Sequence, residues 1–249
     1  MPRVQATNRV KIANMPNTLS FSGSQRITLS TMGTLGSSMG GGFSYGLWLR
    51  NSSKITTVQY YLGTSNSAGG NFLLCGISRN AANAGKPNFQ FRDNTGNTLG
   101  VEINKDIRDG QWHFLVCTKD ATNHVAGMHM YLDGVDMPLT TISDVGLVDP
   151  VNFNRAMAIG SGLGSGAVTL GWVGDESRPC FYDRELTPTE ASDWYFQRKV
   201  PASPFAGYEN TEGSGTAVAD VNGVYNGTLT SATQWSSDTP YKSRPARTY

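Results

Sequence analysis

The sequence predicts an all-β protein, a two-sheet antiparallel jelly-roll sandwich with one short helix. The first observation is alternation: residues 43–50 read FSYGLWLR, with Phe, Tyr, Leu and Leu at every second position, which is the period of a strand. The second is frequent turn formers, among them 29 glycines in 249 residues. The third is a charged fraction of only 16%, against about 25% in an average soluble domain. Many short strands between turns are typical of sandwiches and jelly rolls.

About twelve to fourteen short strands follow one another along the chain. In order, the strand-like runs are TLSFSG, QRITLS, FSYGLWLRN, ITTVQYYLG, NFLLCGIS, PNFQFRDN, TLGVEINK, DGQWHFLVCTKD, AGMHMYLDGVDM, AMAIGSG, AVTLGWVG and RPCFYDRE. Asp133-Gly134 lies between two of these runs and predicts a tight hairpin. The Gly-rich run 161–166, SGLGSG, lacks the Lys-Ser/Thr and the following helix of a phosphate loop, so we expect a turn.

One segment departs from the strand pattern and predicts a helix. Thr187 precedes Pro188, and Glu190 follows, which is the pattern of a capped helix start. We expect Trp194 and Tyr195 to pack this helix against a sheet. A connector rich in proline, VPASP, comes next.

We expect residues 1–249 to form one domain. Its parts are an N-terminal arm over 1–17, the main sandwich over 18–200, a strand pair over 206–235 and a C-terminal tail over 236–249. The segments after the connector are too short to bury a core alone, so we assign them to the same sandwich.

Composition excludes several classes of function. A formal net charge of +1 gives no electrostatic case for nucleic acid. No apolar run reaches the roughly eighteen residues of a membrane span. The first residues lack the apolar core of a secretory leader, so with Met1 present we expect synthesis in a cytosol. Cysteines occur at 75, 117 and 180, each within an apolar run, and we expect three buried free thiols.

Several motifs over residues 18–200 occur in a specific order. They are LSFSGSQRITLS, FSYGLWLRN, DGQWHFLVCTKDATNHVAGMHMYLDGV, AIGSG and FYDRELTPTEASDWY. Together they resemble the laminin-G-like branch of the concanavalin A-like lectin and glucanase jelly rolls, a branch related to the pentraxins. One departure is the longer stretch between Glu176 and Tyr182, which predicts a bulge at Pro179 because proline removes a ladder donor.

Residues 208–235 are similar to the opening strands of that family, yet they come near the end of this chain. One explanation is circular permutation, in which the segment fills the first-strand position of its own sandwich. The alternative is pairing with the sheet edge of a neighbouring subunit. We favour the first, because an unfilled position would expose a sheet edge.

No catalytic residues are predicted, although the resembling superfold includes glycoside hydrolases, which need two flanking carboxylates. Glu102 and Asp106 are separated by an even number of positions, which puts residues on the same face of a strand, but Lys105 indicates that the strand has ended. Asp175 and Glu176 are adjacent, so on a strand they face opposite ways. We expect His113 to be a packed strand residue rather than a catalytic base.

No cofactor is predicted, with calcium as an alternative that the resemblance implies, because some domains of that family bind the ion through rim oxygens. The candidate oxygen ligands are Asp and Asn residues in turns. Stabilisation of those turns by the same side chains explains their presence equally well. The candidates are Asp93, Asn94, Asp175, Asp220 and Asn222. The aromatic candidates for a sugar platform are Trp48, Tyr61, Trp172 and Trp235, although large aromatics are more often core residues.

The leading functional hypothesis is a non-enzymatic structural or binding module on a virion surface, as a capsid decoration, head-fibre or tail-fibre protein. Its partners would be other structural proteins of a homo- or hetero-oligomeric assembly. The expected docking residues are Arg3, Arg9, Lys242, Arg244, Arg247 and Tyr249. A lectin or adhesin that binds cell-surface glycans, with an extracellular location, is the alternative, and a glycoside hydrolase is the third.

Overall fold

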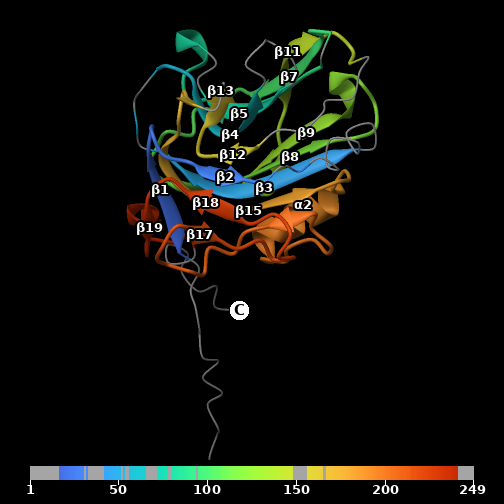
Figure 1. Cartoon of the computed structure of the whole chain (residues 1–249). Coiled ribbons are helices and arrows are strands. Elements are labelled where there is room, and N and C mark those ends of the chain that lie inside the picture. The colour runs from blue at the N-terminus through green and yellow to red at the C-terminus, as the bar shows by residue number, and fades with distance from the viewer. Residues whose placement is uncertain are drawn as a thin grey trace, which may run out of the picture.

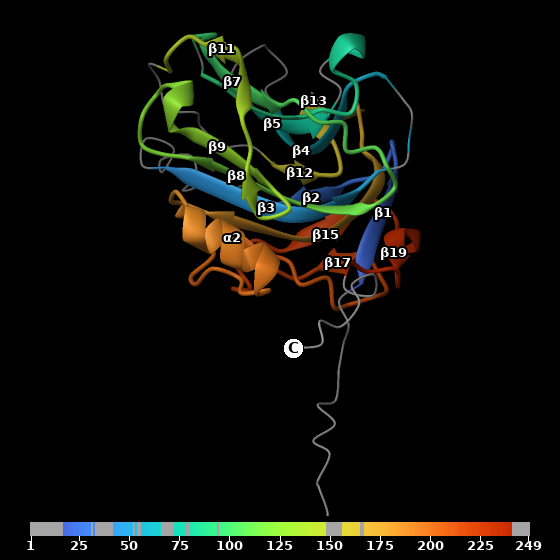
Figure 2. The same ribbon diagram turned by 180° about the vertical axis from the view of Figure 1, so that it is seen from behind.

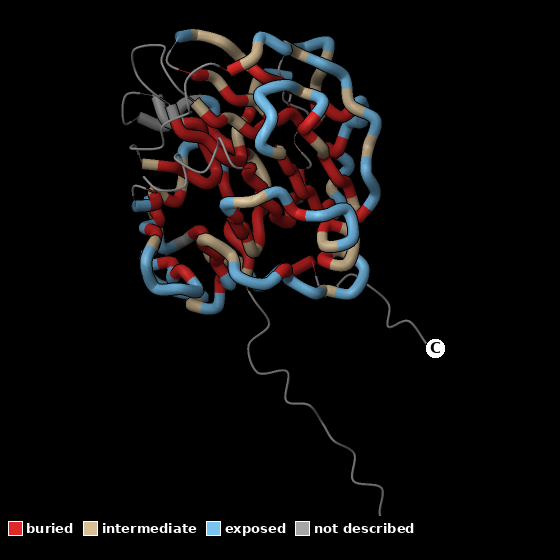
Figure 3. The backbone as a smooth tube through the Cα atoms, turned by 90° about the vertical axis from the view of Figure 1, so that its right-hand side faces the viewer, coloured by how far each residue is buried: buried red, intermediate tan, exposed pale blue. Residues whose placement is uncertain are grey.

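Two antiparallel β-sheets lie face to face and enclose the core (Figure 1). The computed structural model describes residues 17–30, 32, 42–51, 53, 56–65, 72–77, 80–93, 95–147, 156–164 and 167–240. The predicted two-sheet, all-β jelly-roll class is confirmed. Buried backbone occupies the middle of the molecule, and exposed backbone lies in the loops around it (Figure 3).

Sheet A has eight strands. In spatial order they are β10 (Val135–Asp136), β9 (Met128–Leu132), β8 (Trp112–Lys119), β3 (Phe43–Arg50), β15 (Val173–Tyr182), β1 (Thr18–Ser22) and β19 (Trp235–Ser236), with β16 (Ala206–Gly207) also paired to β15. Strands distant in the sequence therefore lie side by side at its centre, where β15 lies between β3 and β1.

Sheet B has nine strands. They are β11 (Leu139–Asp144), β7 (Thr98–Ile103), β6 (Pro87–Arg92), β5 (Phe72–Ile77), β4 (Gln59–Ser65), β12 (Ala158–Ile159), β2 (Ile27–Leu29), β18 (Gly227–Leu229) and β17 (Ala217–Val218). A separate pair joins β13 (Gly162–Gly164) to β14 (Ala167–Thr169). The turn expected over 161–166 is therefore partly wrong, because Gly162–Gly164 forms ladder hydrogen bonds with β14; residues 165 and 166 lie outside the described part.

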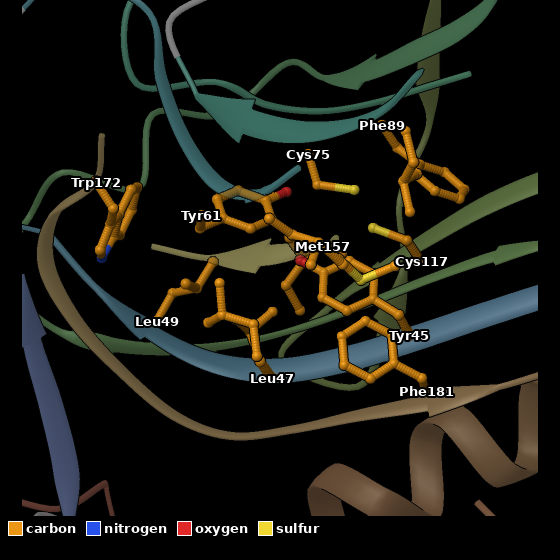
Figure 4. Close-up of a cluster of buried hydrophobic side chains, with 14 of the residues drawn as sticks. Tyr45, Leu47, Leu49, Tyr61, Cys75, Phe89, Cys117, Met157, Trp172 and Phe181 are labelled. Carbon is orange, nitrogen blue, oxygen red and sulfur yellow. The ribbon is translucent and has the colours of Figure 1, made fainter. Parts of the chain in front are cut away.

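Inward-facing side chains of the two sheets form the core (Figure 4). Tyr45 from β3 stacks on Tyr61 from β4 with ring centroids 6.2 Å apart, and on Phe181 from β15 at 5.8 Å. Cys75 and Cys117 come from opposite sheets, and burial raises the pKa of both thiols well above the ordinary value. All three cysteines are free and buried, as predicted.

The Asp133-Gly134 hairpin is confirmed between β9 and β10. Both residues have positive φ, 55° and 82°, which is the requirement of the tight primed turn. The Asp133 carboxylate also accepts hydrogen bonds from the Phe114 backbone N–H at 2.9 Å and from His113 at 2.8 Å. His113 is 6% exposed, so the prediction of a packed strand histidine is confirmed.

The segment near the chain end lies beside the first two strands of the same chain. Gly227 of β18 is opposite Leu29 of β2, and Trp235 of β19 is opposite Leu19 of β1. A Cβ atom at position 227 would lie 2.5 Å from the side chain of Ile27, so close approach of the strands requires glycine there. This is the intramolecular arrangement that the sequence favoured, with β19 ending one residue beyond the boundary at 235.

The predicted helix is α2 (Pro188–Phe196), and it lies outside sheet A, beside β3 and β15 (Figure 2). The Thr187 hydroxyl accepts from the Glu190 backbone N–H at 3.2 Å, and the Glu190 carboxylate accepts from the Thr187 N–H at 2.9 Å. Hydrogen bonds from Arg184 are the largest cause that lowers the pKa of Glu190 to about 2.

Short 3-10 turns occur at η2 (Ala81–Asn83), η3 (Val125–Gly127) and η4 (Ala232–Gln234). None of the helices in the described part of the chain has the length and apolarity that a bilayer crossing requires.

The capping box makes a testable contribution to stability. Replacing Thr187 by Ala should lower the free energy of unfolding by about 1 kcal/mol, because the Glu190 N–H loses its acceptor. Urea unfolding followed by circular dichroism measures this. Thr189→Ala is the matched control, since Thr189 is an exposed residue inside the same helix. Equal losses for the two variants would contradict the capping role.

Candidate functional site

Asp93, the calcium candidate in the turn between β6 and β7, uses its carboxylate for hydrogen bonds within that turn. The Asp93 carboxylate accepts from the Thr95 backbone N–H at 2.9 Å, the Thr95 hydroxyl at 2.7 Å and the Asn97 N–H at 3.0 Å. Asp93 is 0% exposed. This is the turn-stabilising role that the sequence offered as the alternative. Asn94 lies outside the described residues.

The candidates after β17 hold two loops together. The Asp220 carboxylate accepts three backbone N–H groups at 2.9–3.1 Å, from Gly207, Val224 and Tyr225. The Asn222 amide donates to the carbonyls of Pro204 and Phe205 at 2.9 and 3.1 Å. Both side chains therefore fasten the connector after α2 to the 220–225 loop.

The structure does not bring the four described calcium candidates together. Asp175 lies on β15, where the guanidinium of Arg50 donates to its carboxylate at 2.7 and 2.9 Å. Asp93 and Asp220 are on separate turns. Over the described residues, no three His, Cys, Asp or Glu side chains are arranged as a metal site. Calcium binding thus stays a prediction from sequence.

In neither carboxylate pair do the two residues lie on one face of one strand. β7 ends at Ile103, so Asp106 lies beyond the strand that carries Glu102, as expected. The Asp106 carboxylate accepts from Arg108 at 2.6 and 2.9 Å. Asp175 and Glu176 point to opposite faces of sheet A, since Asp175 contacts Arg50 while Glu176 is 1% exposed on the core side.

Most of the aromatic candidates for a sugar platform are buried. Tyr61 and Trp172 are 0% exposed in the core, and their rings pack edge to face at 5.7 Å. Trp48 is 4% exposed. Trp235 is half-buried at the sheet edge, and its indole N–H donates to the Gly215 carbonyl at 2.9 Å. An exposed platform therefore requires other residues.

The outer face of sheet A, which α2 partly covers, carries a second cluster of aromatic side chains. Trp48 from β3 and Phe114 from β8 lie 5.0 Å apart, and Trp194 from α2 packs against Phe114 at 5.0 Å. A Cβ atom at Gly46 would lie 2.6 Å from Trp194, so the bare backbone of β3 admits the indole. The helix thus docks through aromatic packing.

A pocket of about 230 Å³ opens beside α2 on this face. β3, β15, α2 and residues 200–221 contribute to it. Its lining residues are Trp48, Arg178, Pro179, Cys180, Trp194, Val200, Pro204, Gly207, Tyr208, Glu209 and Val221. We call it the bulge pocket, because the β15 bulge forms one wall.

The bulge predicted at Pro179 is confirmed by a register shift between Ser177 and Cys180. Arg178 in the bulge has φ of 53°, a conformation that costs a non-glycine residue about 1–3 kcal/mol. Its guanidinium forms an ion pair with Glu209 at the pocket. The two side chains are 24% and 47% exposed, so both charged groups remain partly accessible to solvent.

The other polar groups of the bulge pocket are already bonded. The Tyr208 hydroxyl donates to the Tyr225 carbonyl at 2.6 Å. The Cys180 thiol donates to the Tyr182 hydroxyl at 3.6 Å, and burial is the largest cause that raises the pKa of this thiol to about 12. Cys180 therefore stays protonated at neutral pH and is a poor nucleophile.

Two residues along β3 from Trp48, a row of side chains crosses four strands. Ser20, Asp175, Arg50 and Trp112 are successive register partners on β1, β15, β3 and β8. Ser20 donates to Asp175, and the Arg50 guanidinium lies 5.0 Å from the centre of the Trp112 ring. Arg50 also donates to Asp238. This cross-strand row lies outside the lining of the bulge pocket and carries fixed polar groups and a half-buried aromatic ring.

Sequence reasoning missed Arg178, Glu209 and Trp112 as site residues. The usable signal was Pro179, which interrupts the strand-like run that carries Arg178. The expected docking residues cannot be placed, since Arg3, Arg9 and those from Lys242 to Tyr249 lie outside the described part of the chain.

Comparisons with known proteins agree on one superfamily. A family model described as the concanavalin A-like lectin/glucanases superfamily matches residues 21–192, more than half of the chain. No curated protein matches the sequence.

Three solved structures illustrate the similarity. A Bacteroides ovatus protein, provisionally named as carbohydrate-binding, has a TM-score of 0.62 at 17% identity, over 88% of this chain and 59% of its own. This chain thus spans under two thirds of that protein. The Ruminococcus gnavus IT-sialidase CBM40 bound to α2,3-sialyllactose gives 0.53 at 10% identity, over 73% of this chain and 97% of its own. Domains LG4-5 of the mouse laminin α1 chain give 0.50 at 14% identity, over 82% and 49%. At these identities the likeness concerns the fold.

Proposed function

Since the chain belongs to the concanavalin A-like lectin/glucanases superfamily, we propose that it is a non-enzymatic, lectin-like module that binds glycans at the outer face of sheet A. The observation that carries the proposal is the bulge pocket, with the cross-strand row farther along β3. The names of two structural neighbours, one called carbohydrate-binding and one bound to sialyllactose, support the same class of ligand.

The chemistry of this face suits a sugar. A sugar ring has apolar C–H faces that pack on aromatic side chains and hydroxyl groups that need fixed partners. Trp112 supplies a half-buried aromatic ring, Trp48 and Trp194 form buried walls of the pocket, and Arg50 and Arg178 hold charged donors in ion pairs. All but Trp194 belong to strands, which hold such groups more rigidly than loops do.

A glycan array with the purified chain tests the proposal, with calcium present and with a chelator. The informative variant is Arg178→Gly. Glycine suits the positive φ, and the lost ion pair is partly exposed, so stability should stay within about 1 kcal/mol. Affinity for the best array ligand should fall at least about tenfold, or 1.4 kcal/mol.

Arg26→Ala is the control, because it removes the same charge from the residue before β2, outside the lining of the pocket. Binding of no glycan under either condition would reject the proposal. Binding that Arg178→Gly leaves unchanged would place the glycan elsewhere on the molecule. Loss of binding with the chelator would assign a role to calcium.

Display on a virion surface, in an assembly with other structural proteins, is a second proposal that goes beyond the glycan-binding class. A fold does not determine where a protein is displayed. Asp238 is bonded to Arg50 and its carbonyl accepts from Thr18 at 2.7 Å, so a truncation that spares the sandwich should begin after Pro240. If the basic residues from Lys242 to Arg247 dock the chain, this truncation should abolish incorporation into particles. Unchanged incorporation would contradict it.

A further inference from the structure

The lining of the bulge pocket is mostly apolar, which is unusual for a site that would hold a sugar whose substituents are all hydroxyl groups. The apolar side chains are Trp48, Pro179, Trp194, Val200, Pro204 and Val221. Resting on the glycan-binding function proposed above, we propose that this pocket receives the acetamido group of an N-acetylated sugar. The methyl group would lie against the apolar lining and the amide against Arg178 and Glu209.

The interior of the pocket disfavours a hydroxyl group. Of its polar side chains, Tyr208 already donates to the Tyr225 carbonyl at 2.6 Å and Cys180 to the Tyr182 hydroxyl at 3.6 Å. A hydroxyl placed against the apolar lining exchanges its water partners for none, whereas a methyl group has no hydrogen bonds to lose. The pocket therefore selects an apolar substituent.

The mouth of the pocket matches an amide. A secondary amide carries one acceptor, its carbonyl oxygen, and one donor, its N–H. Arg178 supplies the donor and Glu209 the acceptor, side by side in an ion pair whose members stay 24% and 47% exposed. The β15 bulge keeps Arg178 in a left-handed conformation with φ of 53°, and strain of this kind is concentrated at ligand sites.

The pocket has room for the acetamido group together with part of the sugar ring. Its volume of about 230 Å³ is below the roughly 300–1,000 Å³ of sites that enclose a drug-sized ligand. Val200 and Val221 remain 38% and 50% exposed at the pocket, so an apolar group could reach them from solvent. The remainder of the glycan would extend over the neighbouring surface toward the cross-strand row.

Isothermal titration with matched sugars tests the inference on the full chain. N-acetylglucosamine is compared with glucose, and N-acetylgalactosamine with galactose. We expect the acetylated member of at least one pair to bind tenfold or more tightly than its partner. Val221→Trp should abolish that preference by filling the pocket. Val224→Trp, the same change at a 63% exposed valine outside the lining, should preserve it.

The outcomes separate this inference from the proposed function. Equal binding within both pairs overturns the acetamido assignment and leaves glycan binding standing. A preference that survives Val221→Trp overturns the assignment to this pocket. Failure of every glycan on the array rejects the proposed function and this inference with it. If Val221→Trp does not fold, Arg178→Gly provides the same test, because it removes the amide's donor with little effect on the backbone.

Discussion

Replacing Glu176 by Gln is expected to remove a large loss of stability that the protein undergoes as pH rises. Glu176 lies on β15, is 1% exposed, and faces the core. Neither carboxylate oxygen has a hydrogen-bond partner among the described residues. Burial, with a smaller contribution from the charge of Asp175, raises the pKa of this carboxyl well above the ordinary value of 4.5.

The sign of the effect follows from proton binding. The folded state retains the Glu176 proton to higher pH than the unfolded state, whose pKa is ordinary. Stability is therefore complete below pH 4.5 and is lost as pH rises toward and through the raised pKa. Between the two pKa values the loss is about 1.4 kcal/mol for each pH unit. Glutamine cannot ionise, so the variant should lack this slope.

Urea unfolding at a series of pH values from 4 to 9 measures the slope in the wild type and in Glu176→Gln. The difference between the two proteins isolates Glu176 from the other titrating groups. Glu185→Gln, an exposed residue just after β15, is the matched control and should follow the wild type. Parallel wild-type and Glu176→Gln curves would contradict the prediction.

Replacing Trp194 by Ala should lower the free energy of unfolding by about 3–5 kcal/mol. Trp194 is 6% exposed and packs edge to face on Phe114 at 5.0 Å and on Tyr182 at 5.8 Å. Gly46 beneath it has no side chain that could fill the space. The variant should also lose glycan binding, because Trp194 lines the bulge pocket.

Phe196→Ala is the control for this second prediction. Phe196 is an aromatic residue of the same helix, but it is 49% exposed, so its removal should cost far less. Urea unfolding of the three proteins under identical conditions gives the comparison. Similar losses for Trp194→Ala and Phe196→Ala would indicate that α2 is held by general helix contacts and not by the indole.

Features governed by neighbouring residues were predictable from the sequence. The start of α2 follows from Thr187, Pro188 and Glu190, which satisfy each other's backbone groups within one turn. The hairpin follows from Asp133-Gly134, because few residue pairs accept positive φ at both positions. Pro179 marked the bulge in β15, since a residue without an N–H interrupts the ladder.

The candidate site was not predictable in this way. Trp48 and Trp194 are 146 positions apart in the sequence. The helix α2 follows β15 along the chain, and it lies beside β3 because β15 pairs with β3. Alternation put Asp175 and Glu176 on opposite faces of a strand without showing which face is covered. The structure places Asp175 beside Arg50 and Glu176 inside the sandwich.

By itself the sequence determined the all-β class, the period-two strands, the capped helix α2, the hairpin and the bulge, because each depends on the backbone preferences of a few adjacent residues. Only the tertiary structure decided that β18 and β19 lie beside β2 and β1, that Tyr61 and Trp172 are core residues, and that Arg178 meets Glu209 at a pocket. Burial and strand pairing depend on which distant segment covers a surface. The local alternation of side chains is the same whichever face of a strand becomes buried, so it cannot identify that segment.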